Sequence, residues 1–176
     1  YSQPKPRRCI MWFKNTLQKI HNQLGLYKIH MCPEVHGRLT DNGKPLVNVK
    51  IERSLSYSDG KYVEDSAMTD DNGCFFFPEV NIRSNHPSLL IVEQNTSQSI
   101  TCSYHNEEYV LWGASLLGNV YREDFALKLA SLNGDIANEE VMFQFDSIAG
   151  DEYTNNAFGI CKWEFDYEVI SIQSYL

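Results

Sequence analysis

Beyond Pro33 the apolar residues of the chain recur at every second position, and this period of two constrains the fold more than any other feature. In one clear run, Val47, Val49 and Ile51 alternate with polar residues. Such alternation gives a strand one apolar and one polar face, and the aromatic content of 12% also favours strands. We therefore expect the 176 residues to form a mainly β protein, a sandwich or barrel around one core.

Glycine-bearing turns separate the predicted strands. We expect two tight hairpins, the first made of Val35–Leu39, Asp41–Gly43 and Val47–Ile51, and the second of Met68–Asp70, Asp71–Gly73 and Cys74–Phe77. Further strands are expected at Leu89–Glu93, Ser99–Tyr104, Glu108–Trp112, Phe125–Leu129, Val141–Phe145 and the alternating run Trp163–Val169. The less regular stretches, which we expect to be loops, are Ser54–Asp65, Gly113–Asp124 and Ser131–Glu140.

The segment 1–33 differs from the rest of the chain in charge and in period. It holds six of the 15 Lys and Arg residues and no acidic residue, so it carries +6, and the remaining 9 basic and 23 acidic residues give −14. From Ile10 to Leu24 the apolar residues follow three- and four-residue steps, which predicts an amphipathic helix ending near Gly25. We expect a basic helical leader at 1–33 and a β-sandwich with a C-terminal strand extension at 34–176.

Two turn motifs resemble those of a known fold family. Val35–Ile51 contains a strand, a glycine-proline turn and an alternating strand, and Thr69–Phe77 reads T-D-x-x-G-x-F-x-F. Both resemble carboxypeptidase regulatory-like, transthyretin-like domains. With Phe77–Val80, Val92–Gln94 and Glu107–Trp112, the likeness is strongest to an uncharacterised proteobacterial family of this fold and covers roughly residues 34–130. The resemblance implies a transthyretin-like Greek-key β-sandwich that serves as a scaffold or recognition module.

No pattern of catalytic or cofactor-binding residues emerges from the sequence. The hydrolase of 5-hydroxyisourate shares the transthyretin fold, but its C-terminal motif is absent from Gln173–Leu176, so we expect no catalytic, cofactor or metal residues. Asp70–Gly73 lacks the spacing of a calcium loop and is explained by a turn. The five cysteines have no zinc-type spacing. Cys9 and Cys32 bracket the leader helix and could form a disulfide, and the alternative is that all five are buried or free thiols.

The composition favours a non-enzymatic, protein-binding role. Net charge −8 argues against nucleic-acid binding, and no apolar run is long enough to cross a membrane. We expect an exported bacterial protein, periplasmic or secreted, that binds a partner protein such as a cationic toxin or effector in the manner of an immunity protein, and a cytoplasmic location is the alternative. The candidate partner-binding residues are Tyr57, Tyr62, Tyr104, Tyr121 and Tyr153.

Other roles remain open. A carbohydrate or cell-envelope attachment module would use Trp12, Trp112 or Trp163 to stack on sugars. A peripheral membrane protein would use the basic leader helix, which would otherwise pack on its own acidic body or fill a partner's groove.

Overall fold

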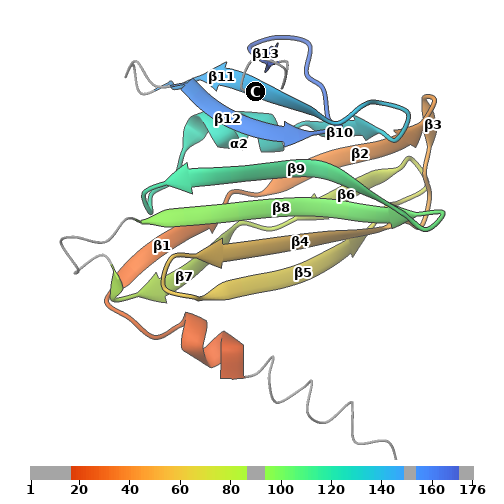
Figure 1. Ribbon diagram of the computed structural model, residues 1–176. Coiled ribbons are helices and arrows are strands. Elements are labelled where there is room, and N and C mark those ends of the chain that lie inside the picture. Colours follow the sequence, from red (N-terminus) through yellow and green to blue (C-terminus); the bar gives the residue numbers. More distant parts are fainter. Residues whose placement is uncertain (1–16, 87–93, 149–153, 171–176) are drawn as a thin grey trace, which may run out of the picture.

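The computed structural model describes residues 17–86, 94–148 and 154–170, and the chain forms two layers made mainly of β-strands (Figure 1). The first layer is a seven-stranded sheet in which each described pairing is antiparallel. Its strands, in spatial order, are β13 (Glu168–Ile170), β11 (Val141–Asp146), β12 (Thr154–Gly159), β9 (Glu107–Leu117), β8 (Asn95–Tyr104), β4 (Lys50–Tyr57) and β5 (Tyr62–Met68).

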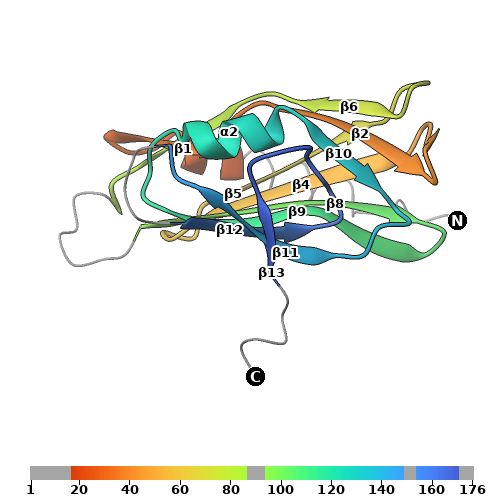
Figure 2. The same cartoon turned by 90° about the horizontal axis from the view of Figure 1, so that it is seen from above.

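The second layer is made of two smaller sheets and a helix. One sheet pairs β1 (Tyr27–Cys32) with β7 (Val80–Ser84), and the other gathers β3 (Lys44–Pro45), β6 (Cys74–Phe77) and β10 (Leu132–Asp135) around β2 (Val35–Asp41). The β10–β2 pairing is parallel. Helix α2 (Glu123–Leu129) lies beside β2, and Figure 2 shows β6, β2 and α2 along one side of the molecule and β8, β9 and β12 along the other.

Alternation along the strands supplies the core between the layers. In β4, Ile51, Arg53, Leu55 and Tyr57 are buried and the residues between them are exposed. Trp112 of β9 is fully buried. It packs at ring-centroid distances of 5.9 to 6.4 Å against Phe125, Phe143, Phe145 and Trp163. The prediction of a mainly β sandwich with a short helix is confirmed, and the relation to transthyretin-like domains stays a prediction.

The buried Arg53 links the two layers. Its side chain has no exposed surface, and its guanidinium donates to the Asp65 carboxylate at 2.9 and 2.6 Å and to the Pro78 carbonyl at 2.9 Å. The guanidinium also lies 4.7 Å from the centre of the Phe77 ring. Because a buried charge is tolerated only when it is paired and hydrogen-bonded, this site fixes β4 and β5 against the β6–β7 connection.

The first glycine turn closes a short hairpin of β2 and β3, so a tight turn at Asp41–Gly43 is confirmed, but the predicted pairing of the flanking strands is only partly right. After β3 the chain leaves this sheet and enters β4, which pairs with β5 and β8 in the other layer. After the second turn it leaves β5 and enters β6, which pairs with β2. A period of two shows which face of a strand is buried, but it does not identify the strand's partner.

The second turn contacts strand β2 just ahead of the first turn, and we call Arg38, Leu39, Asn72 and Gly73 the corner junction. The Leu39 amide donates to the Gly73 carbonyl at 2.8 Å, and Arg38 Nε donates to the Asn72 carbonyl at 2.9 Å. Gly73 has a φ of +76°, and a Cβ there would lie 2.4 Å from the Leu39 carbonyl oxygen. The junction therefore needs glycine at this position both for its backbone conformation and for its contact.

Asp135 of β10 holds the first turn in place. Its carboxylate accepts hydrogen bonds from the Asn42 and Gly43 amides at 3.0 and 2.7 Å, from Thr40 Oγ1 at 2.7 Å and from the Ala137 amide at 2.9 Å. Burial alone would raise the pKa of Asp135, but these hydrogen bonds outweigh burial and lower the pKa to about 2. The carboxylate thus connects segments about ninety residues apart in the sequence.

Several predicted elements differ from the structure. Phe125–Leu129 is part of helix α2, with acidic residues in the first turn and Lys128 in the last, an arrangement that the helix dipole favours. Trp163–Val169 contributes only to β13, since Asp166 has a φ of +64° that ends the extended run. Ser54–Asp65 is the hairpin of β4 and β5, and Gly113–Leu117 belongs to β9.

The other predicted strands are either confirmed or lie outside the described residues. Ser99–Tyr104, Glu108–Trp112 and Val141–Phe145 are confirmed as strands, and Leu89–Glu93 lies outside the described residues. Within Ser131–Glu140, expected as a loop, residues 132–135 form β10. Residues 17–22 of the leader are helical, whereas β1 at 27–32 pairs with β7 and so belongs to the second layer. In the described segments, helices are too short or too polar to cross a bilayer.

Replacing Gly73 should destabilise the fold more than replacing Gly43. Both have positive φ, but a Cβ at Gly43 would meet open space. We expect Gly43→Ala to lower the free energy of unfolding by about 1 kcal/mol through backbone strain alone. Gly73→Ala should lower it by about 3 kcal/mol, because the clash with Leu39 adds to the strain. Urea unfolding of both variants measures the difference. Equal losses in the free energy of unfolding would show that the junction accommodates a Cβ at position 73 without a clash.

The contribution of Asp135 should disappear in acid. Its folded pKa of about 2 lies below the ordinary value of 3.8, so its stabilisation is complete above the ordinary value and is lost as the pH falls toward 2. We expect wild type to be more stable than Asp135→Asn at pH 6, with the difference shrinking steadily below about pH 4. Urea unfolding at a series of pH values tests this, and a pH-independent difference would contradict the assignment.

Candidate functional site

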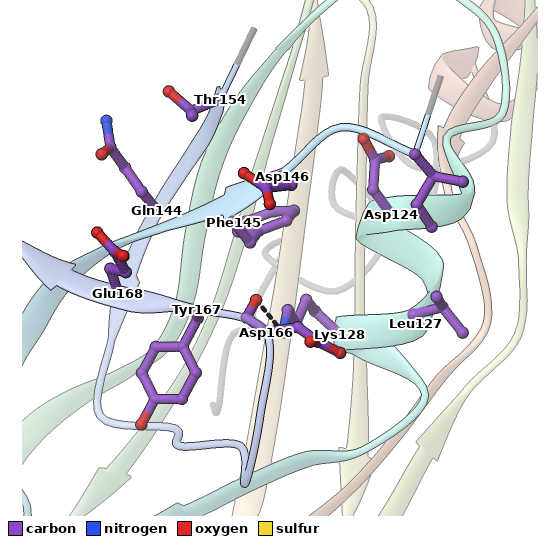
Figure 3. A pocket seen from close by; sticks show the side chains of 11 residues that line it. Asp124, Leu127, Lys128, Gln144, Phe145, Asp146, Thr154, Asp166, Tyr167 and Glu168 are labelled. Atoms are coloured by element: carbon purple, nitrogen blue, oxygen red, sulfur yellow. Dashed lines mark hydrogen bonds between the residues drawn. The ribbon is translucent and has the colours of Figure 1, made fainter. Parts of the chain in front are cut away.

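A cavity of about 520 Å³ opens between α2, the ends of β11 and β12, and the segment that leads into β13 (Figure 3). Its size falls within the range of ordinary ligand pockets. In Figure 3, Asp124, Leu127 and Lys128 come from α2, and Gln144, Thr154 and Glu168 stand on the opposite side. We call this cavity the acidic pocket, and its lining is Asp124, Leu127, Lys128, Gln144, Phe145, Asp146, Ile148, Thr154, Asp166, Tyr167 and Glu168.

Lys128 forms one wall of the acidic pocket and ties down the segment that precedes β13. Its Nζ donates to the carbonyls of Phe165 and Asp166 at 3.1 and 2.8 Å. Burial lowers the pKa of Lys128, and the nearby Asp166 partly opposes that effect. The ammonium also lies 5.4 to 5.8 Å from the ring centres of Phe145, Trp163 and Tyr167. This lysine is therefore engaged with the protein itself rather than available to a ligand.

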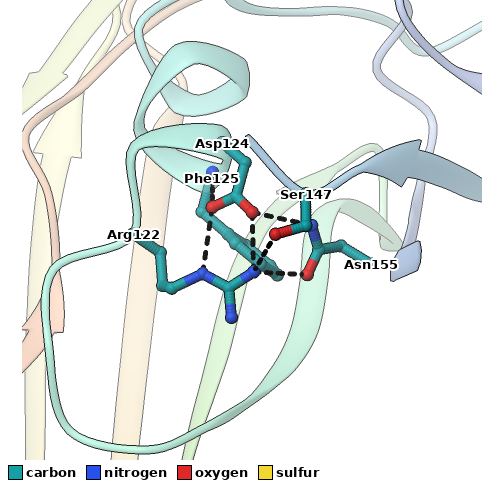
Figure 4. Close-up of polar contacts among 5 residues, drawn as sticks. All are labelled: Arg122, Asp124, Phe125, Ser147 and Asn155. Atoms are coloured by element: carbon teal, nitrogen blue, oxygen red, sulfur yellow. Dashed lines mark hydrogen bonds and ion pairs between the residues drawn. The ribbon is translucent and has the colours of Figure 1, made fainter. Parts of the chain in front are cut away.

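Asp124 is neutralised within a second network (Figure 4). Its carboxylate accepts from Arg122 Nη2 at 2.6 Å, from Asn155 Nδ2 at 2.8 Å and from the Phe125 amide at 3.0 Å. Burial would raise the pKa of Asp124, but these hydrogen bonds dominate and lower it. The network joins α2 to β12 and so fixes the width of the pocket, while its charge is already paired.

The remaining carboxylates make the pocket negatively charged. The lining holds four acidic residues and one lysine, a formal charge of −4 + 1 = −3. Asp146, Asp166 and Glu168 are exposed, as are the rim residues Leu127 and Ile148. Carboxylates around an apolar rim attract a cation that also carries an aliphatic or planar apolar part. Within the described part of the chain, no group of three or more ligating side chains could hold a metal ion.

The predicted tyrosines do not come together at this pocket. Tyr57 is 3% exposed in the core, so it offers no surface to a partner in this structure. Tyr62 and Tyr121 are exposed, the first on edge strand β5 and the second ahead of α2 beside His30, at a ring distance of 5.0 Å. Tyr104 is half-buried and stacks on His105 at the far end of β8. Tyr153 lies outside the described residues.

Sequence reasoning misses two residues of the pocket. Tyr167 lies in a run whose alternation predicts a continuous strand, and Lys128 lies in Phe125–Leu129, where the sequence also predicts a strand. The spacing of Phe125 and Leu129, four residues apart with acidic residues just before them, is the signal that could have identified the helix.

The described cysteines are free thiols. Cys32 has no exposed surface, and because Cys9 lies outside the described residues, the Cys9–Cys32 disulfide stays a prediction. Burial raises the pKa of Cys32 to about 11, with Arg53 opposing the effect, and raises that of Cys102 to about 11. Burial likewise raises the pKa of Cys161. These three thiols are protonated and enclosed, which suits packing rather than reaction.

The tryptophans proposed for sugar stacking are placed unfavourably. Trp112 is fully buried, and Trp163 packs against Lys128, to whose carbonyl it donates a hydrogen bond at 2.9 Å. Trp12 lies outside the described residues.

Comparison with known proteins gives one family. A family model described as a domain of unknown function (DUF6795) matches residues 35–139. No curated protein and no solved structure matches the chain. The matched segment contains the corner junction, Asp135 and α2, and it ends before β11. The acidic pocket therefore combines α2 from the matched segment with strands that follow it.

Removing the Lys128 ammonium should loosen the pocket wall. In Lys128→Met the apolar stem stays, but the carbonyls of Phe165 and Asp166 lose their donor, and we expect a loss of about 2 kcal/mol in the free energy of unfolding. The exposed Lys162 should then be cut faster by trypsin, which mass spectrometry can follow. Leu127→Met, on the exposed neighbouring position, is the control and should change neither quantity. Unchanged cleavage in Lys128→Met would show that Lys128 does not hold this segment.

Proposed function

Because the chain belongs to a family described as a domain of unknown function (DUF6795), whose description assigns no activity, we propose a function from the site itself. The protein is a non-enzymatic binding domain that receives a cationic side chain of a partner protein in the acidic pocket. The proposal depends on which charged side chains of the pocket already have partners within the protein. Lys128 and Asp124 already have partners in the protein, and Asp146, Asp166 and Glu168 face the opening as exposed carboxylates.

The geometry suits an arginine or lysine side chain. The carboxylates provide acceptors for a guanidinium or ammonium, and the half-buried Tyr167 provides a ring for its apolar part. Leu127 and Ile148 at the rim offer apolar contact to residues on either side of that cation. The residues that contribute most to binding at an interface usually lie at its centre, surrounded by contacts that exclude water.

The charge of the chain supports a cationic partner. Residues 34–176 carry −14, and such a field speeds the encounter with a protein of opposite charge. A concrete form of the proposal is an immunity-type protein, exported by a bacterium to the periplasm, that neutralises a cationic toxin. In that form the pocket would capture a basic residue that the toxin needs for its activity.

Neutralising two exposed carboxylates should test the pocket. We expect N-acetyl-arginine amide, added to the full chain, to shift the NMR signals of pocket residues at low salt. In Asp146→Asn/Glu168→Gln the affinity for this probe should fall about tenfold or more. Both side chains are exposed, so the free energy of unfolding should change by less than about 0.5 kcal/mol.

A matched control separates the pocket from overall charge. Glu64→Gln/Glu108→Gln removes the same two charges from exposed positions on β5 and β9, and it should bind the probe like wild type. A protein captured from the native host by wild type and by this control, but not by the pocket variant, would support a protein partner. Equal capture by all three, or equal binding of N-acetyl-norleucine amide, would overturn the proposal.

A further inference from the structure

The described part of the leader contacts the sandwich through its polar side. Asn22 is 5% exposed and donates to the Tyr62 carbonyl at 2.7 Å, and Gln18 donates to the same carbonyl at 3.4 Å. Gln18 also donates to Asn22 Oδ1 at 3.0 Å. These contacts place the helical residues 17–22 at the start of β5, and they use the side of the helix that an amphipathic helix normally turns toward water.

The turn after the helix fixes its direction. Lys61 is buried and its Nζ donates to the Leu24 carbonyl at 2.6 Å, and the Leu26 amide donates to Asn85 Oδ1 at 2.9 Å. Gly25 has a φ of +141°, and a Cβ there would lie 2.5 Å from the Ser84 backbone. The connection to β1 is thus closely packed, and it holds the leader in one orientation.

That orientation exposes the apolar side of the helix. Leu17, Ile20 and Leu24 are 64%, 54% and 59% exposed, and Leu26 is exposed beside them. We call Leu17, Ile20 and Leu24 the leader stripe. They follow the three- and four-residue spacing that in the sequence begins at Ile10 and Phe13, so the stripe is the end of a longer apolar pattern. Exposed aliphatic side chains on one face of a helix indicate a contact surface.

We propose that the leader stripe is a contact for an anionic lipid surface, with the sandwich held on the water side. Segment 1–33 carries six cations and no acidic residue, which complements anionic headgroups. The body carries −14 and is repelled by the same surface, so the contact is confined to the leader and the acidic pocket stays in solution. The sequence also places Trp12 and Phe13 next to the basic residues, and such rings favour the headgroup region.

Vesicle binding of the full chain tests this proposal. We expect co-sedimentation with vesicles of phosphatidylcholine and phosphatidylglycerol at low salt, and little with phosphatidylcholine alone. The binding should weaken in 0.5 M NaCl, since salt screens the cations of the leader. Leu17→Glu/Ile20→Glu should lower the partition coefficient onto these vesicles about tenfold or more. The variant removes two aliphatic contacts and adds two negative charges, which the anionic surface repels.

Controls keep the outcome specific to the leader stripe. Leu117→Glu/Val169→Glu adds the same charges at two other exposed apolar positions, on β9 and β13, and should bind vesicles like wild type. Asp146→Asn/Glu168→Gln should also bind vesicles normally, which separates this proposal from the acidic pocket. Absence of binding by wild type would overturn the proposal, as would equal binding by the stripe variant. A dimer in solution that the stripe variant abolishes, without vesicle binding by wild type, would assign the stripe to a second copy instead.

Discussion

The corner junction is the contact on which the two-layer arrangement depends. The second glycine turn carries the chain from the first layer into β6 of the second, and the hydrogen bond from the Leu39 amide to the Gly73 carbonyl, at 2.8 Å, joins that turn to β2 just ahead of the first turn. Asp135 adds the parallel strand β10 to the same corner by accepting from the Asn42 and Gly43 amides. Because the contact allows no Cβ at Gly73, one small residue determines how closely the second turn approaches β2 at this corner. The buried Arg53 then links the layers farther along β4, through its hydrogen bond to the Pro78 carbonyl and its contact with the Phe77 ring.

The two candidate sites use residues other than those of the corner junction. The acidic pocket lies where α2 meets β11, β12 and the segment before β13, and its walls are held by the Lys128 contacts and the Asp124 network rather than by the corner. The leader docks beside β5 through Asn22. A rigid scaffold with a charged pocket and a separate basic helix can bind a cationic partner at one site and an anionic surface at another, because the two sites attract opposite charges.

The sequence predicts the class of fold well and the site poorly. Alternation identified β-structure because burial on one face follows directly from the side-chain period, as Ile51, Arg53, Leu55 and Tyr57 of β4 illustrate. It does not identify strand partners, so it cannot show that β4 pairs with β5 and β8 or that β6 pairs with β2. The pocket depends on a long-range contact between Lys128 and the segment before β13, thirty-seven and thirty-eight residues away, and no local pattern encodes it. The sequence also does not show that Tyr57 is buried, because its exposure is set by packing between the layers, whereas Tyr62 and Tyr121 are exposed and stay candidates.

Native-state hydrogen exchange tests most directly whether the corner is part of the cooperative fold. The Leu39 amide, which donates to Gly73, should exchange only when the whole domain unfolds, with the same free energy of opening as the amides of the interior strand β8. Agreement between the two, and a parallel decrease of both with added urea, is the expected result. Exchange of the Leu39 amide at a much lower free energy, while β8 stays protected, would show that the layers hold together without the corner.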